Sequence, residues 1–206
     1  MTRDELAQDL SYVRAIAEDG QKAPLIGGSV LIYFGVLLTV AYSIQWALLT
    51  GQFGHTSSIW FPVLWISFGL AMSGVGLLRG RVRKLPGASS MANRTDGVIW
   101  QGVGVAILAV VIGAISHSIA KQDFTAPNLI MAFGFGAYGV ALRSTAILSD
   151  NGWLRPFALL SFVLSAVLLF FLDEPWTYLL AAAGCVAVLI LPGVVMMQRE
   201  PKPLAA

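Results

Sequence analysis

Six long apolar runs dominate the sequence, and they limit the chain to one class of fold. Each has 19 to 24 residues, close to the roughly 20 that a helix needs to cross about 30 Å of hydrocarbon. Backbone groups in lipid find hydrogen-bond partners only within their own helix, and the two-residue alternation of barrel strands is missing. The sequence therefore predicts an all-α, polytopic membrane protein with transmembrane helices at 25–48, 59–78, 98–119, 127–148, 154–172 and 176–197.

Composition agrees with this class. Of the 206 residues, 57% are hydrophobic and 12% are charged, whereas about 25% are charged in an average soluble domain. A soluble protein of this size would need more charge at its surface. We expect a six-helix membrane domain, 24–198, between a cytoplasmic amphipathic N-terminal helix, 1–23, and a cytoplasmic tail, 199–206.

The lysines and arginines predict how the helices are oriented. Twelve of the 13 fall on one side of the predicted spans, and only Lys121 falls on the other. Basic residues accumulate in cytoplasmic loops, so both termini and the connection 79–96 are expected in the cytoplasm. Since 1–23 carries eight charges, it does not resemble a cleaved signal peptide. Without a transit peptide or lipidation motif, we expect a multi-pass protein of the bacterial inner membrane.

The second and fourth runs share a spacing that predicts an internal repeat. Phe68, Gly69 and Gly74 follow Pro62 at the same offsets at which Phe133, Gly134 and Gly139 follow Pro127. The sixth run keeps only a trace of this spacing. The pattern suggests three tandem helical hairpins, although proline at helix starts and glycine in membrane helices can also recur by chance. Gly69, Gly74, Gly134 and Gly139 are candidate helix-packing positions, because glycine lets two backbones approach closely.

No pattern of catalytic or metal-binding residues is present, so we expect neither an enzyme nor a cofactor or metal site. His55, His117, Asp123, Asp173 and Glu174 face outward in the predicted topology without the spacing of metal ligands. The single cysteine, Cys185, lies in an apolar sequence where a thiol is usually inert. A net charge of +2 gives no reason to expect a nucleic-acid partner.

The polar residues near the middle of the runs are few: Thr39, Ser67, Tyr138 and Ser165, with Arg143 as the one charge well inside a run. Arg143 either extends to the cytoplasmic surface or binds an anionic group. Candidate contacts to anionic lipid are Arg79, Arg81, Arg83, Lys84 and Arg143. Tryptophans near the run ends, Trp100 among them, are expected to anchor the helices at the membrane interface.

The N-terminal segment is the candidate surface for a protein partner. Leu6, Leu10 and Val13 recur at helical spacing, with charged residues on the other faces. The helix either binds a partner or packs beneath its own bundle.

The sequence from Ala23 to Gly28 (APLIGG), preceded by a charged helix and followed by an aromatic-bearing span, resembles uncharacterised bacterial six-span inner-membrane proteins. These are often encoded beside a winged-helix regulator. The resemblance implies a genomic neighbourhood, not an activity.

Two classes of function fit these features. The first is a non-enzymatic regulatory or accessory protein, including an immunity-type protein, which acts through a protein partner. The alternative is a transporter or permease subunit for a small solute or a lipid-like substrate; its weakness is the scarcity of polar groups in the runs. A membrane enzyme is a third, less supported class. The genes beside it would distinguish them, whereas the oligomeric state cannot be inferred from the sequence.

Overall fold

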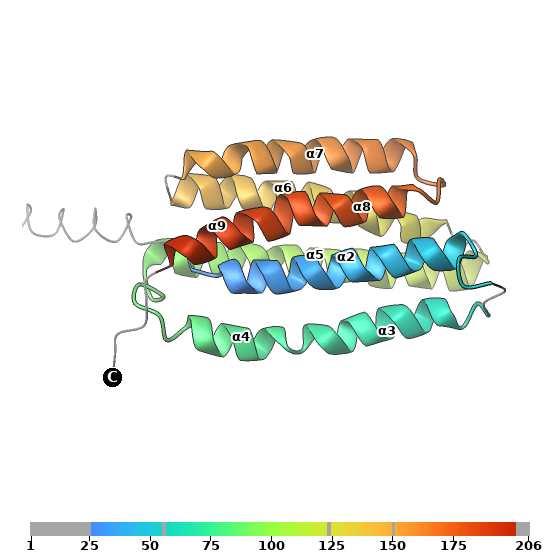
Figure 1. Ribbon diagram of the computed structural model, residues 1–206, viewed down its shortest axis with the longest axis horizontal. Helices are drawn as coiled ribbons and strands as arrows, with labels where there is room; N and C mark the ends of the chain where they lie inside the picture. The colour runs from blue at the N-terminus through green and yellow to red at the C-terminus, as the bar shows by residue number, and fades with distance from the viewer. Residues whose placement is uncertain (1–25, 55–56, 123–124, 150, 201–206) are drawn as a thin grey trace, which may run out of the picture.

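A computed structural model describes residues 26–54, 57–122, 125–149 and 151–200, and these residues form an all-helical bundle without strands (Figure 1). The α-helices are α2 (Gly28–Leu49), α3 (Trp60–Met72), α4 (Val75–Val82), α5 (Met91–Lys121), α6 (Leu129–Leu148), α7 (Arg155–Phe170), α8 (Thr177–Cys185) and α9 (Leu191–Arg199). Short 3₁₀ turns, Ala126–Asn128 and Gly152–Leu154, precede α6 and α7, and a π-helix, Val186–Ile190, joins α8 to α9.

Six helical segments are long and apolar enough to cross a membrane, which confirms the predicted number. The second combines α3 with α4, and the sixth combines α8, the π-helix and α9. Successive segments run in alternate directions along the long axis of the bundle (Figure 1). The tandem-hairpin duplication remains a prediction.

The third span differs most from its predicted bounds, because α5 begins at Met91 rather than near residue 98. Ser90 is its N-cap, and the Ser90 side chain accepts a hydrogen bond from the backbone N–H of Asn93. Such a cap satisfies one of the free donors of the first turn, so polar residues there join the helix. The second span also continues to Val82, which leaves only 83–90 as the connection.

The core lies between α2, α6, α7 and the last span. Phe135 and Leu142 of α6, Leu168 of α7 and Leu189 of the π-helix are fully buried. In contrast, α3 and α4 have no buried residue and pack beside α2. Their apolar side chains and those on the outer face of α5 are the surfaces that lipid or a partner would cover.

Glycines bring the first and last spans into backbone contact. A Cβ at Gly28 would lie 2.5 Å from the carbonyl oxygen of Gly193, and a Cβ at Gly35 would lie 2.7 Å from Cγ1 of Ile190. Among the predicted packing positions, Gly74 lies against the Tyr33 hydroxyl of α2, and Gly139 lies against the Phe162 ring of α7.

Gly134 is buried, and the nearest atoms to a Cβ there belong to Tyr138 of its own helix. Gly69 faces open space. The two glycine pairs with matching spacing therefore have different neighbours in the structure.

Pro192 explains the π-helix in the last span. A proline ring within a helix clashes with the carbonyl of the residue four positions earlier, which is Val188. The wider turn of residues 186–190 directly precedes Pro192, and α9 continues from Leu191. The span bends at this point without ending.

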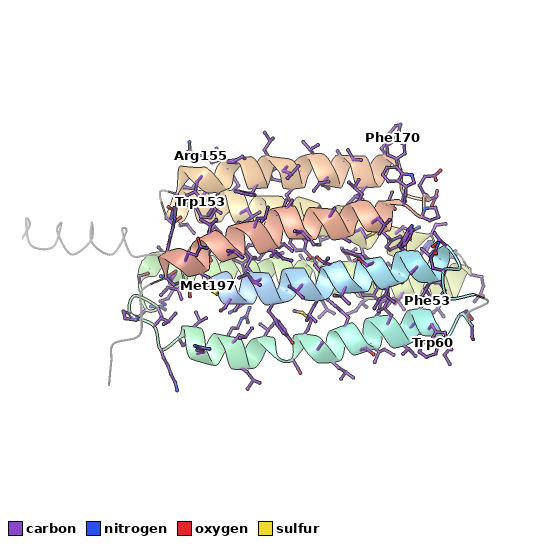
Figure 2. The ribbon with its side chains drawn as sticks, viewed as in Figure 1. Phe53, Trp60, Trp153, Arg155, Phe170 and Met197 are labelled. Atoms are coloured by element: carbon purple, nitrogen blue, oxygen red, sulfur yellow. The ribbon has the colours of Figure 1, made fainter. Side chains whose placement is uncertain are left out.

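The bundle has one strongly basic end, where α2, α5 and α7 begin and α4, α6 and α9 finish (Figure 1). Eight of the nine lysines and arginines that the structure describes lie near this end, and Lys121 lies at the other. Figure 2 shows Trp153 and Arg155 at the basic end and Trp60 at the opposite end. The guanidinium of Arg199 lies 5.1 Å from the centre of the Trp153 ring.

Candidate functional site

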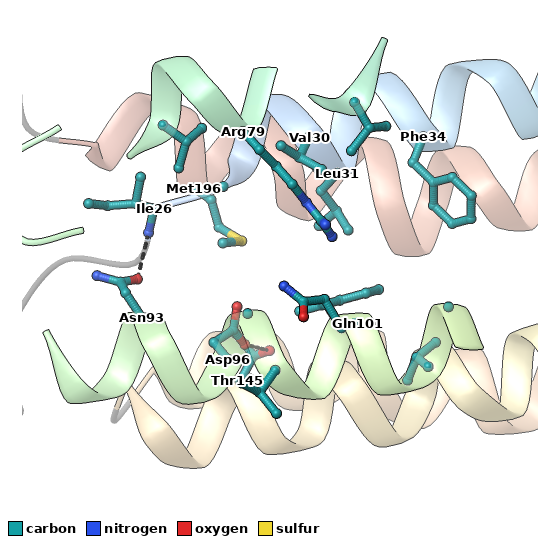
Figure 3. Close-up of a pocket in the computed structure, with 18 of the residues that line it drawn as sticks. Ile26, Val30, Leu31, Phe34, Arg79, Asn93, Asp96, Gln101, Thr145 and Met196 are labelled. Atoms are coloured by element: carbon teal, nitrogen blue, oxygen red, sulfur yellow. Dashed lines mark hydrogen bonds between the residues drawn. The ribbon is translucent and has the colours of Figure 1, made fainter. Parts of the chain in front are cut away.

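A cavity of about 450 Å³ lies near the basic end, between α2, α4, α5 and α6 (Figure 3). Its walls are mainly apolar, with Val30 and Leu31 from α2, Val75 from α4 and Val103 from α5 among the lining residues. Direct contact between α4 and α5 is slight, because α4 packs on α2 and α5 packs on α6. The separation of these two helices leaves room for the cavity.

Asp96 is the principal buried polar group of the cavity. It lies in the second turn of α5, and its residue surface is only 7% exposed. The Thr145 hydroxyl of α6 donates a hydrogen bond to one carboxylate oxygen, Oδ1. Figure 3 shows Asp96 beside Thr145 at the base of the cavity. No ion pair joins Asp96 to a basic side chain in the described part of the chain, so its charge lacks a cationic partner there.

Thr145 contributes to the position of the Asp96 carboxylate. Its single hydroxyl proton lies between two acceptors, Asp96 Oδ1 and the backbone carbonyl oxygen of Ala141 at 2.9 Å. Both Thr145 and Ala141 are buried. With the Thr145 hydroxyl and the Trp100 side chain as its hydrogen-bond partners, the carboxylate still has unused acceptor capacity, since its two oxygens offer about four sites.

Three aromatic side chains line the cavity on the side away from the basic end. The Trp100 ring stacks on Tyr138 with centroids 6.4 Å apart, and Phe34 meets Tyr138 edge-on at 5.6 Å. Trp100 is one turn after Asp96 on α5 and interacts with its carboxylate. Trp100 therefore packs against the core and the cavity, which differs from the interface anchor expected from the sequence.

Arginines stand at the exposed rim. Arg79, Arg83 and Arg94 line the cavity and are themselves exposed. In Figure 3 the side chain of Arg79 extends from α4 across the cavity toward Gln101 of α5. The cavity thus combines cationic groups at its rim with a carboxylate in its interior.

Two glycines of α5 keep this space open. Gly97 and Gly104 line the cavity, and a Cβ built on either residue meets no atom within 4 Å. Gly102 is also unobstructed but does not line the cavity. At 100° per residue, positions 102 and 104 point about 200° apart around the helix. A larger side chain at 104 would enter the cavity, whereas one at 102 would not.

The predicted lipid contacts separate into three groups. Arg79 and Arg83 line the main cavity, whereas Arg81 and Lys84 are exposed and do not line it. Arg143 lies with Arg155 at a second hollow of about 340 Å³ between α6 and α7, walled by Pro156, Leu159 and Phe162.

The remaining candidate residues lie elsewhere. Leu6, Leu10 and Val13 are outside the described residues, as are His55 and Asp123. Cys185 is buried in the core. No cluster of three metal-ligating side chains occurs within the described ranges.

Asp96 is the residue that the sequence did not single out, since it falls there in the polar connection between two spans. The residues around the start of α5 do indicate that Asp96 belongs to a helix. Ser90 follows the turn at Pro86 and Gly87 and is a favourable N-cap. A helix from Met91 places Asp96, Trp100, Val103 and Ile107 on one face. The sequence of this segment alone does not predict that its face lies against α2, α4 and α6.

Comparisons of the chain with protein-family models, with curated proteins and with solved structures each give no match. The function is therefore inferred from the geometry of the cavity.

Proposed function

We propose that the chain is a non-enzymatic membrane protein that binds an amphipathic, lipid-like small molecule in the cavity, as a permease or as its ligand-binding subunit. The observation that carries this proposal is one cavity with apolar walls, a buried carboxylate and arginines at the rim. It favours the transporter alternative over the regulatory function that the sequence placed first.

The size and lining of the cavity support a small-molecule ligand. Ligand pockets commonly have volumes of about 300–1,000 Å³, mostly apolar walls and a few polar groups that orient the ligand. The volume here, about 450 Å³, is within that range. A very polar solute would leave the apolar walls unmatched, while a plain hydrocarbon would leave the Asp96 carboxylate without a cationic partner. An amphipathic molecule matches both.

The cavity extends from the basic end only part of the way along the bundle. Beyond Tyr138, buried side chains such as Phe135, Tyr42 and Tyr178 fill the space between the helices. Binding is therefore the step that this arrangement supports directly. Transport would additionally require these aromatic side chains to separate.

A membrane location at the bacterial inner membrane, with the basic end in the cytoplasm, is part of the proposal. It is supported by the six apolar segments and by the grouping of eight of the nine described basic residues at one end. The cavity would then open at the cytoplasmic side.

A cavity-filling substitution tests the proposed binding. Purified protein in a mild detergent would be titrated with lysophospholipids that carry a fluorescent label at the end of the acyl chain. We expect saturable binding to the parent and to Gly102→Leu, and loss of binding in Gly104→Leu. Equal binding by all three proteins would contradict the proposal, as would the absence of saturable binding in the parent.

The regulatory or accessory class is the second candidate, and one observation favours it. None of the most apolar window of Trp60–Val82 is buried, against 39% for the first span and 56% for the fourth. A helix with so little contact to its own bundle has a face free for a membrane partner. Cysteine at Ile66, which is 63% exposed, would cross-link to such a partner or to a second copy in native membranes. Labelling by lipid-phase reagents without any cross-linked protein would favour a lipid-covered face.

A further inference from the structure

The charges of the cavity are arranged in a fixed order from the rim to the interior. Arg79, Arg83 and Arg94 are exposed at the rim, and Asp96 is buried behind them. A ligand that enters past the arginine rim meets these cations before it reaches the buried carboxylate. This order restricts the chemistry of a matching ligand.

The interior of the cavity favours a positively charged group on the ligand. A buried carboxylate is costly unless a cation or several hydrogen bonds compensate it. Asp96 has hydrogen bonds to the side chains of Thr145 and Trp100, and it has no ion pair within the described residues. A ligand ammonium would supply both a charge and N–H donors.

The aromatic side chains next to Asp96 also favour an ammonium group on the ligand. Trp100, Tyr138 and Phe34 line the cavity and contact one another. Cations are attracted to aromatic faces, tryptophan being the best of them, and more strongly where water is excluded. Aromatic rings beside a carboxylate are therefore suited to an ammonium and unsuited to an anion.

The arginine rim favours a negatively charged group on the ligand. Arginine guanidinium groups are favoured ligands of phosphate, because their fixed N–H donors match its oxygens. Arg79 reaches from α4 across the cavity in Figure 3. In a ligand with its phosphate at Arg79 and its ammonium at Asp96, a short linker would join the two groups.

We propose that the ligand is a phospholipid or lysophospholipid with a zwitterionic head group, with its ammonium at Asp96 and its phosphate at the arginine rim. The phosphate and then the ammonium of such a lipid follow the order from the arginine rim to Asp96, and its acyl chain would lie along the apolar lining residues Val75, Val103 and Ile107. This inference rests on the proposed function and specifies its substrate class.

The test compares two chain-labelled lipids that differ only in the head group, lysophosphatidylethanolamine and lysophosphatidylglycerol. We expect the parent to bind the ethanolamine lipid more tightly by about tenfold to a hundredfold, the range for a hydrogen bond to a charged group. Asp96→Asn keeps the shape of the side chain and should remove this preference. Arg79→Gln should weaken binding of both lipids while the preference remains, since both carry the phosphate.

The outcomes separate the two proposals. If Gly104→Leu abolishes binding but Asp96→Asn retains the parent's preference, the zwitterionic head group is wrong and the binding cavity stands. If Gly104→Leu binds like the parent, the cavity itself is wrong. Should Asp96→Asn fail to fold, as judged by gel filtration and thermal melting, equal affinities of the parent for both lipids would still overturn the inference.

A soluble competitor distinguishes a lipid from a free metabolite with the same charged groups. Free phosphoethanolamine should displace the labelled lipid at least about a hundredfold more weakly than unlabelled lysophosphatidylethanolamine, because it buries no chain. Equal potency of the two would overturn the lipid assignment.

Discussion

Glu200, the C-cap of α9, accepts hydrogen bonds through Oε1 from the backbone N–H groups of Gly27 and Gly28, each at a distance of 2.9 Å. The residue that follows the final span thereby caps the first turn of α2. A carboxylate at this position satisfies two free donors and interacts favourably with the helix dipole. The contact joins the first and last spans beside the cavity.

Substitution of Glu200 should therefore destabilise the bundle. We expect Glu200→Ala to lower the free energy of unfolding by about 1–2 kcal/mol, as for loss of a helix cap. Glu200→Gln should have a smaller effect, because the amide oxygen still accepts while the charge is lost. Thermal or denaturant unfolding in detergent measures both. Glu174→Ala, at the opposite end, is the matched control and should be neutral; equal effects at 174 and 200 would contradict the capping role.

Close packing of α2 on α9 gives a second prediction. A Cβ at Gly28 would lie 2.5 Å from the Gly193 carbonyl oxygen and 2.6 Å from the Met197 nitrogen, and neither backbone atom can rotate away. We expect Gly28→Ala to lower the free energy of unfolding by about 1–3 kcal/mol, the usual cost of overpacking.

Gly76→Ala is the control for Gly28→Ala. A Cβ at Gly76 in α4 meets nothing within 4 Å. Alanine is a better helix former than glycine by about 1 kcal/mol, so this variant should be neutral or more stable. A neutral Gly28→Ala would show that α2 and α9 lie farther apart than described.

The apolar spans could be predicted because length and hydropathy alone specify them. The packing of glycines could not, since it depends on which helices become neighbours. Gly134 is buried beside Tyr138, while Gly69, at the same distance from its proline, faces open space. Spacing along one helix identifies a face but does not identify what covers it.

The cavity also could not be predicted from the sequence. Its polar groups come from three separate segments: Arg79 on α4, Asp96 on α5 and Thr145 on α6. The polar first turns of α5 resemble a loop by composition, and their helical structure depends on the Ser90 cap and on burial against α6. Tertiary contact determined this part of the fold.

Membrane topology is the third prediction. In a Cys185→Ala background, Ser89→Cys lies in the connection between α4 and α5, and Ser57→Cys lies at the opposite end. Both serines are exposed. A membrane-impermeant maleimide should label position 57 in intact cells and position 89 only after the cells are opened. The reverse pattern would place the basic end outside.

The N-terminal segment provides the last prediction, which concerns its apolar stripe of Leu6, Leu10 and Val13. A row of apolar side chains on a charged helix is unfavourable in water, so a protein surface is expected to cover it. The combined substitution Leu6→Asp and Leu10→Asp should leave expression, detergent stability and lysophospholipid binding unchanged, and should remove a co-purifying partner or a cellular phenotype. Substitution of Asp4 and Asp19 by asparagine changes the same segment on the face that helical spacing places opposite the stripe, and it serves as the control. Unfolding of the double aspartate variant would mean that the helix packs on its own bundle, and behaviour like the parent in every assay would mean that the stripe has no partner.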